Sequence, residues 1–213
     1  MARRIGVIGS GTVAKTLARG FAKKGYDVRI GTRDASKVAD VVAEGIKAGT
    51  PAEVAAHGEL IVLAVKGGGA LEAAALAGAA LDGKPVIDTT NPISDAPPQD
   101  GILNFFTGPN DSLMERLQAA HPAAHFVKAW NSVGAGFMVD PQLPGGPPTM
   151  FTCGNDAGAK AQVVAVLREF GWDVEDIGKA AGARAIEPLC QLWCAPGLQR
   201  NQWSHAYKVL RAG

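Results

Sequence analysis

The feature that most constrains this chain is a glycine-rich turn between a short apolar run and an amphipathic stretch near its start. Residues 5–8 form the apolar run, which is typical of a strand buried on both faces of a parallel sheet. Gly9, Gly11 and Ala14 then occupy the positions at which a dinucleotide-binding turn needs small residues. Gly9 permits the tight turn, Gly11 lets backbone approach a pyrophosphate, and Ala14 lets the helix pack close to the strand. The pattern predicts a Rossmann-type βαβ unit, with a tight turn of another α/β fold as the alternative.

The start of the helix after this turn is a predicted anion site. Its first N–H groups have no partner within the helix, and the positive end of the helix dipole lies there. Leu17 and Phe21 continue the apolar stripe, and Gly25 can end the helix. The residues predicted to hold the cofactor pyrophosphate are Gly9, Ser10, Gly11, Thr12 and Val13.

The end of the second predicted strand indicates which dinucleotide the chain binds. An NAD site usually has Asp or Glu here to accept hydrogen bonds from the ribose 2′-hydroxyl, whereas this chain has Thr32 and Arg33. The planar fork of Arg33 suits a phosphate, and Lys37 can reach the same phosphate if a helix starts just before it. We therefore predict NADP(H), held by Thr32, Arg33 and Lys37. Asp34 leaves NAD as the alternative, but it follows the Arg, where we expect a turn or helix-capping role.

Strands and helices alternate along most of the chain, which predicts a doubly wound, mainly parallel sheet. The fold class is α/β, a Rossmann-type sheet with a short C-terminal helical extension. A Pro- and Gly-rich stretch divides the chain into an NADP-binding domain, 1–140, and a small α/β extension, 141–213. The expected strands are 5–8, 28–31, 60–64, 85–88, 125–128, 150–153 and 173–177, and the expected helices are 13–24, 50–57, 70–81, 111–121, 156–170 and 180–210, the last with a break near Pro196.

The ligand of such a sheet is expected at the carboxyl ends of its strands. Four segments follow strand ends and converge on this edge: 9–13, 64–69, 90–92 and 128–133. We therefore expect the active site there. A loop at 93–109 is long enough to be functional or disordered.

The overall charge is close to neutral. The chain has 21 Lys and Arg against 20 Asp and Glu, a formal net charge of +1, so neither nucleic acid nor an anionic membrane is expected as a partner. No apolar run approaches the roughly 18 residues that a spanning helix needs, and the run after the basic start breaks at Gly9, too early for a signal peptide. We expect a cytoplasmic protein.

The cysteines and histidines do not form a metal or redox motif. An odd number of cysteines without C-x-x-C spacing favours small buried residues over a redox pair, although Cys190 and Cys194 could share a helix face. His121 and His125 are separated by a predicted helix end, so no metal site is expected. His205, in the last predicted helix, is an outside candidate for the substrate pocket.

Seven segments in order resemble the NADPH-dependent reductases of the deazaflavin coenzyme F420, and also the oxidoreductase domain of the six-transmembrane metalloreductases. The segments are IGVIGSGTVAKTLA, GTRD, VLAVK, PVIDTTNPI, FVKAWNSVGA, PTMFTCGND and EPLCQLW, which extend from Arg4 to about Trp193. The resemblance implies hydride transfer between NADPH and a flavin-type ring, with F420 or FMN/FAD as co-substrate. Such transfer needs no acid–base residue, because the protein positions two stacked rings and excludes water.

The resemblance also implies roles for individual residues. Thr32, Arg33 and Lys37 match the residues that bind the 2′-phosphate in this family. Two residues near the second ring have proposed roles: Lys128 could favour an anionic acceptor ring, and Asn131 could hold a ring carbonyl or amide. As isolated residues, Lys128 would be a solvated strand-end lysine and Asn131 a loop residue that bonds its own backbone. The remaining residues expected beside the nicotinamide ribose or under the second ring are Ala64, Val65, Lys66, Asn91, Pro92 and Ala129.

Two other functions are compatible with these residues. One is an NADP-binding redox sensor without turnover, which the three consecutive glycines at 67–69 and the missing general acid also fit. The other is a reductase of a small carbonyl or imine substrate. A short C-terminal tail leaves little chain for a separate substrate domain, so we expect a homodimer in which a partner subunit helps to form the site.

Overall fold

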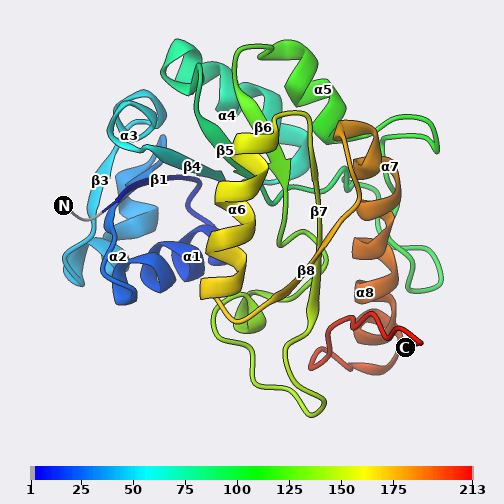
Figure 1. Cartoon of the computed structure of the whole chain (residues 1–213). Helices are drawn as coiled ribbons and strands as arrows, with labels where there is room; N and C mark the ends of the chain where they lie inside the picture. The colour runs from blue at the N-terminus through cyan, green and yellow to red at the C-terminus, as the bar shows by residue number, and fades with distance from the viewer. Residues whose placement is uncertain (1–2, 213) are drawn as a thin grey trace.

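A computed structural model describes residues 3–212 and shows a single eight-stranded sheet (Figure 1). The strand order is β3-β2-β1-β4-β5-β6-β7-β8, with every neighbouring pair parallel except β6 and β7. The order reverses direction between β1 and β4, which is the switch point of a doubly wound sheet. The predicted α/β Rossmann-type fold is therefore confirmed. The strands are β1 (Arg4–Ile8), β2 (Asp27–Gly31), β3 (Lys47–Gly49), β4 (Leu60–Leu63), β5 (Pro85–Asp88), β6 (His125–Lys128), β7 (Thr149–Gly154) and β8 (Asp173–Asp176).

Helices cover both faces of the sheet, and each face has its own apolar cluster. On one face, α1 and α6 pack on β-strand residues such as Val7 and Val62; Figure 1 shows α6 crossing in front of the sheet. On the other face, α3, α4, α5 and α7 pack on Leu63 and Phe126. The helices are α1 (Thr12–Lys23), α2 (Ala39–Ala43), α3 (Pro51–His57), α4 (Ala70–Ala77), α5 (Leu113–Ala120), α6 (Ala157–Glu169), α7 (Ala183–Ile186) and α8 (Pro188–Arg200), with 3-10 turns η1 (Ala35–Val38), η2 (Gly67–Gly69), η3 (Gly78–Leu81), η4 (Ala135–Phe137) and η5 (Ala180–Gly182).

Local sequence signals explain several helix starts. The Thr50 hydroxyl accepts a hydrogen bond from the backbone N–H of Glu53, and the Glu53 carboxylate accepts one from the Thr50 N–H, which completes the capping box of α3. At the start of α5 the Ser112 side chain accepts from the Glu115 N–H, and at the start of α6 the Asp156 side chain accepts from the Ala159 N–H. These side chains satisfy N–H groups that the first turn of a helix leaves unpaired.

The C-terminal part differs from the sequence-based expectation. The predicted break at Pro196 is wrong, because α8 continues through Pro196 to Arg200. The carbonyl that loses its helical partner is that of Leu192, a residue that is 60% exposed. The predicted helix beyond Arg200 is also wrong, since residues 201–212 form no helix or strand.

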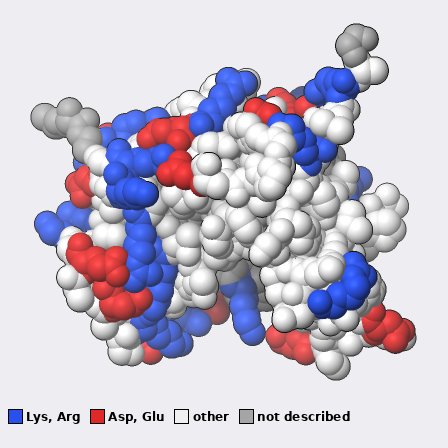
Figure 2. Space-filling model, turned by 90° about the horizontal axis from the view of Figure 1, so that it is seen from below, with Lys and Arg blue, Asp and Glu red and all other residues white. Residues whose placement is uncertain are grey.

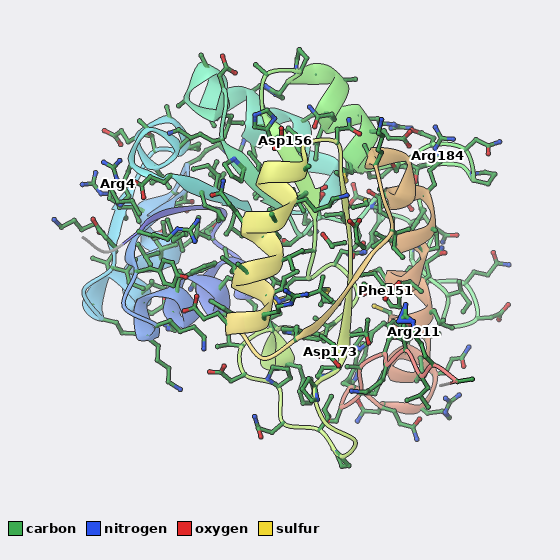
Figure 3. All side chains as sticks on the ribbon, in the orientation of Figure 1. Arg4, Phe151, Asp156, Asp173, Arg184 and Arg211 are labelled. Carbon is green, nitrogen blue, oxygen red and sulfur yellow. The ribbon has the colours of Figure 1, made fainter. Side chains whose placement is uncertain are left out.

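Residues 201–212 instead fold back against the sheet edge (Figure 3). The Tyr207 carbonyl accepts a hydrogen bond from the Thr149 N–H of β7. Lys208 forms an ion pair with Asp173, and Arg211 forms one with Glu175, both on β8. The sheet itself continues from β6 into β7 across residues 141–148, so the two predicted domains share one sheet. Their division at residue 140 stays a prediction.

Charged side chains on the surface are mostly paired rather than gathered by sign. Arg19 of α1 pairs with Asp40 and Glu44 at the edge of α2. Figure 2 likewise shows basic and acidic residues intermixed, with a broad uncharged area between them. Among the described residues, no helix has the length and apolar character needed to cross a membrane.

Candidate cofactor and substrate site

The turn between β1 and α1 presents backbone to an open space at the sheet edge. Gly9 has a φ of +141°, and a Cβ there would lie 2.1 Å from the carbonyl oxygen of Ala64, so a side chain is excluded. A Cβ at Gly11 would meet nothing within 4 Å. Gly11 is the N-cap of α1 and makes no side-chain capping bond, and the first turn of α1 has no acidic residue. No capping side chain or acidic residue therefore occupies the start of α1, where backbone N–H groups can meet an anion.

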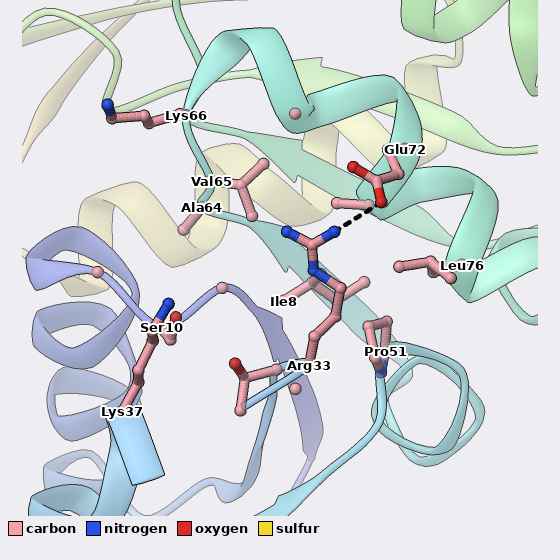
Figure 4. A pocket seen from close by; sticks show the side chains of 16 residues that line it. Ile8, Ser10, Arg33, Lys37, Pro51, Ala64, Val65, Lys66, Glu72 and Leu76 are labelled. Carbon is pink, nitrogen blue, oxygen red and sulfur yellow. Dashed lines mark hydrogen bonds and ion pairs between the residues drawn. The ribbon is translucent and has the colours of Figure 1, made fainter. Parts of the chain in front are cut away.

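The end of β2 places the predicted phosphate-binding residues beside this turn. Thr32, Arg33 and Lys37 all line the same cavity (Figure 4). Asp34 caps η1, where its carboxylate accepts hydrogen bonds from the Ser36 N–H at 3.0 Å and the Ser36 hydroxyl at 2.6 Å. These bonds lower the pKa of Asp34 below its ordinary value. The predicted capping role of Asp34 is confirmed, and Asp34 does not line the cavity.

Two adjoining cavities lie along the carboxyl edge of the sheet. The first, about 410 Å³, extends from the end of β2 past the glycine turn to α4. The second, about 650 Å³, extends from α1 and η2 to the segment after β5. Both volumes are in the range of ligand sites. The residues that line both cavities, and so form the boundary between them, are Arg33, Ala64, Val65, Lys66 and Gly69.

The second cavity lies where the nicotinamide and an acceptor are expected. Val13 and residues 67–69 form one side, and Thr89, Thr90 and Asn91 form another. Gly67 packs tightly on this segment, since a Cβ there would lie 1.8 Å from the Asn91 carbonyl oxygen. The loop predicted at 93–109 contains isolated β-bridges but no helix or strand. Its first residues, 93–95, also line the cavity. Three of the four segments expected at this edge therefore meet at the two cavities.

The fourth segment, 128–133, lies behind the cavity wall. Asn131 is 4% exposed, and its Nδ2 donates to the Asn91 side-chain oxygen at 3.0 Å and to the Ile186 carbonyl at 3.1 Å. The Asn91 Nδ2 in turn donates to the Asn131 carbonyl at 2.7 Å. Asn131 therefore orients Asn91, and it bonds other segments rather than its own backbone. Ala129 is fully buried in the core, and Pro92 is buried outside both cavities.

The structure shows that Lys128 is not a solvated strand-end lysine, whereas its role toward a second ring stays a prediction. Its side chain is fully buried, and Nζ lies 2.7 Å from Asp88 Oδ2 and 2.8 Å from Glu187 Oε1. Nζ also donates to the Thr90 carbonyl at 2.8 Å. Burial alone would lower the pKa of Lys128, but the charges of Asp88 and Glu187 outweigh it and raise that pKa. Lys128 is thus a buried cation that holds the backbone of the cavity wall.

Lys128, Asp88 and Glu187 form a buried triad, and its two carboxylates have further partners. Asp88 Oδ1 accepts from the Thr90 N–H at 2.8 Å and the Thr90 hydroxyl at 2.6 Å. Glu187 accepts from the N–H groups of Leu113 and Met114, the first residues of α5, each at 3.0 Å. The start of a helix favours a negative charge. The triad therefore joins the end of β5, the start of α5 and the start of α8 beneath Thr90.

Three functional candidates were missed from the sequence. Asp88 was expected at a strand end and Glu187 inside the last helix, and nothing local shows that they meet Lys128. Glu72, in the first turn of α4, lines the first cavity and lies 2.6 Å from Arg33. The only hint in the sequence is that Glu72 is the sole acidic residue of an Ala- and Leu-rich helix.

His205 does not reach either cavity. It lies in the non-helical segment after α8, where its ring stacks on Trp193 with centroids 5.0 Å apart. Its Nε2 lies 3.1 Å from the Trp193 carbonyl oxygen, and the Trp193 ring N–H donates to the His205 carbonyl. The residue is a packing contact of the tail. Within residues 3–212, no group of three or more His, Cys, Asp or Glu side chains is placed to hold a metal ion.

Comparison with known proteins identifies the family of the chain. Residues 4–92 match the family described as NADP oxidoreductase, coenzyme F420-dependent. The crystal structure of a protein assigned as an F420-dependent NADP-reductase from Arthrobacter sp. FB24 has a TM-score of 0.90 and 34% identity, covering 97% of this chain and 99% of that one.

Two more distant relatives share part of the arrangement. Metalloreductase STEAP3 of Rattus norvegicus is 28% identical over 188 residues, 88% of this chain. The chain spans only 36% of that protein. A reductive aminase from Aspergillus terreus, in complex with NADPH and ethyl-5-oxohexanoate, has a TM-score of 0.66 at 20% identity, over 90% of this chain and 61% of that one. This last likeness concerns the fold alone.

Proposed function

The chain belongs to the family of coenzyme F420-dependent NADP oxidoreductases, and from that premise we propose that it transfers hydride between NADP(H) and a flavin-type ring such as F420. The observation that carries the proposal is the pair of adjoining cavities along the carboxyl edge of the sheet. One suits the phosphate-rich half of a dinucleotide, and the other has room for a nicotinamide and a second ring. A cytoplasmic location and a homodimer are parts of the same proposal.

The first cavity supplies the contacts that NADP(H) needs. The free N–H groups at the start of α1 and the open space beside Gly11 suit the pyrophosphate. Arg33, Lys37 and the Thr32 hydroxyl suit the 2′-phosphate, which separates NADP from NAD. Among the described residues, Lys37 and Lys66 form no ion pair that would compete with a bound anion.

The second cavity supplies position and shelter rather than acid–base chemistry. A reduced nicotinamide donates hydride directly to a stacked acceptor ring, so the ring geometry decides the rate. Ala64 and Val65 form the wall between the two cavities. Thr90 and Asn91 also line the second cavity, and hydrogen bonds from or to Asp88, Lys128 and Asn131 hold them in place. We propose that this wall keeps the two rings in register and limits the entry of water.

The test is turnover with purified protein. NADPH oxidation is followed by the absorbance of the reduced nicotinamide, with F420, FMN, FAD, a ferric chelate, a small carbonyl and a cyclic imine as acceptors, and then again with NADH. Turnover of one flavin-type acceptor with NADPH supports the proposal. Turnover of only the carbonyl or imine would identify a different reductase, and tight NADPH binding without any turnover would indicate the redox sensor.

A glycine pair provides the matched control for this assay. Gly11→Ala adds a methyl group to the open space where the pyrophosphate is expected, so NADPH turnover should fall by at least about tenfold while thermal stability changes little. Gly136→Ala adds the same methyl group at an exposed position that also meets nothing within 4 Å. It lines neither cavity and should leave turnover unchanged. Equal turnover in both variants would place the pyrophosphate elsewhere.

A further inference from the structure

Arg33 and Glu72 form an ion pair across the first cavity. Arg33 follows β2, and Glu72 lies in the first turn of α4 on the far side of the cleft; Nη1 and Oε1 are 2.6 Å apart (Figure 4). Both side chains are largely exposed, at 70% and 61%. The pair therefore bridges two elements that a bound dinucleotide must separate or pass between.

This ion pair holds the guanidinium away from the other phosphate-binding residues. Figure 4 shows Lys37 and Ser10 on the opposite side of Arg33 from Glu72. Arg33 lines both cavities, so its side chain stands at their boundary. Glu72 has no other ion-pair or hydrogen-bond partner within residues 3–212, whereas Arg33 is one of three residues suited to the 2′-phosphate. The Arg33 guanidinium thus has two candidate partners, the Glu72 carboxylate and the 2′-phosphate of the ligand.

We propose that Glu72 is a specificity-determining residue that competes with the 2′-phosphate of NADP(H) for Arg33. The inference rests on the proposed cofactor role of the first cavity. When NADP(H) binds, Arg33 exchanges the Glu72 carboxylate for the phosphate, and Glu72 is left as a negative charge near a dianion. Both effects weaken NADP(H) binding. NADH has no 2′-phosphate and does not draw Arg33 away, so Glu72 narrows the preference for NADPH and speeds release of NADP+.

The variant Glu72→Gln tests the competition, because Gln keeps the size of the side chain and removes its charge. We expect the dissociation constant for NADPH to fall by about two- to fivefold at low ionic strength, the effect of an exposed ion pair. The dissociation constant for NADH should not change. The gain should shrink in about 1 M salt, because salt weakens exposed ion pairs. Binding is measured by titration calorimetry or by nicotinamide fluorescence.

The matched control is Glu44→Gln. Glu44 is an exposed acid paired with Arg19 at 2.7 Å, and it lines neither cavity. Its substitution should leave both dissociation constants unchanged. The effect of Glu72→Gln should also vanish when it is combined with Arg33→Gln, since the contested group is then gone.

Three results would overturn the inference. Weaker NADPH binding in Glu72→Gln would mean that Glu72 orients Arg33 toward the phosphate, and unchanged binding would mean that the two do not compete. In both cases wild-type protein still binds NADPH, so the proposed function stands while the inference fails. Wild-type protein that binds no NADPH would overturn the proposed function and the inference together.

Discussion

Removal of the Lys128 ammonium by the substitution Lys128→Met should strongly destabilise the protein. Methionine fills a similar volume but leaves Asp88 and Glu187 as two carboxylates in a region from which solvent is excluded. Breaking a buried ion pair by removing one partner costs about 3–5 kcal/mol, because the remaining charge has no compensation. For a chain of 213 residues this corresponds to a fall in Tm of roughly 6–20 °C.

The assay is thermal and urea unfolding followed by circular dichroism. Lys208→Met is the control, because it also removes a lysine that pairs with an aspartate, here Asp173 at 3.2 Å on the surface. An exposed pair contributes about 0–1 kcal/mol, so its Tm should change little. Adding Glu187→Gln to Lys128→Met should recover part of the loss, because one buried charge is then removed. Equal stability of the two lysine variants would refute the reasoning.

The raised pKa of Lys128 should make the stability of the protein depend on pH. The neighbouring carboxylates raise this pKa above 10.5, its ordinary value. A group whose pKa is raised by folding contributes stability that is fully present below its unfolded pKa and is lost as the pH rises through the folded one. The wild-type protein should therefore lose stability above about pH 10.5 by more than Lys128→Met does.

Two other predictions concern cofactor binding by Arg33 and the reactivity of the cysteine thiols. Arg33→Gln should weaken NADPH binding by about ten- to hundredfold, the effect of a charge-assisted hydrogen bond, and leave NADH binding unchanged; an equal loss for both cofactors would show that Arg33 does not contact the 2′-phosphate. Iodoacetamide should modify Cys194 before Cys153 in the native protein, as read by mass spectrometry. The neighbouring Cys190 lowers the pKa of the partly exposed Cys194, whereas burial raises the pKa of Cys153 to about 12. Faster modification of Cys153 would mean that its surroundings open to solvent.

Features that depend on neighbours in sequence were predictable. The glycine turn, the capping box before α3 and the capping role of Asp34 each involve residues within a few positions of one another, so residue type and spacing determine the geometry. The alternation of short apolar strands with helices likewise predicted the parallel sheet. Its order around the switch point follows from short right-handed crossovers, which leave few topologies.

Weak local signals explain the errors in secondary structure. β3 has only three residues, Lys47–Gly49, and no apolar alternation, so it forms only because β2 offers a parallel partner. Pro196 stays inside α8, and Leu192, whose carbonyl it leaves without a helical partner, is a largely exposed residue. The tail after Arg200 is held by contacts with β7 and β8, and these outweigh any helical preference of its own.

The sequence by itself determined the fold class, the glycine turn after β1 and the family, because short segments with local geometry carry all three. Only the tertiary structure decided the state of the charged residues. Lys128 meets Asp88 and Glu187 from 40 and 59 positions away, and Arg33 meets Glu72 from 39 positions away. Whether such a residue is solvated, buried or held by an opposite charge depends on which segments the fold brings together, and no local pattern encodes that.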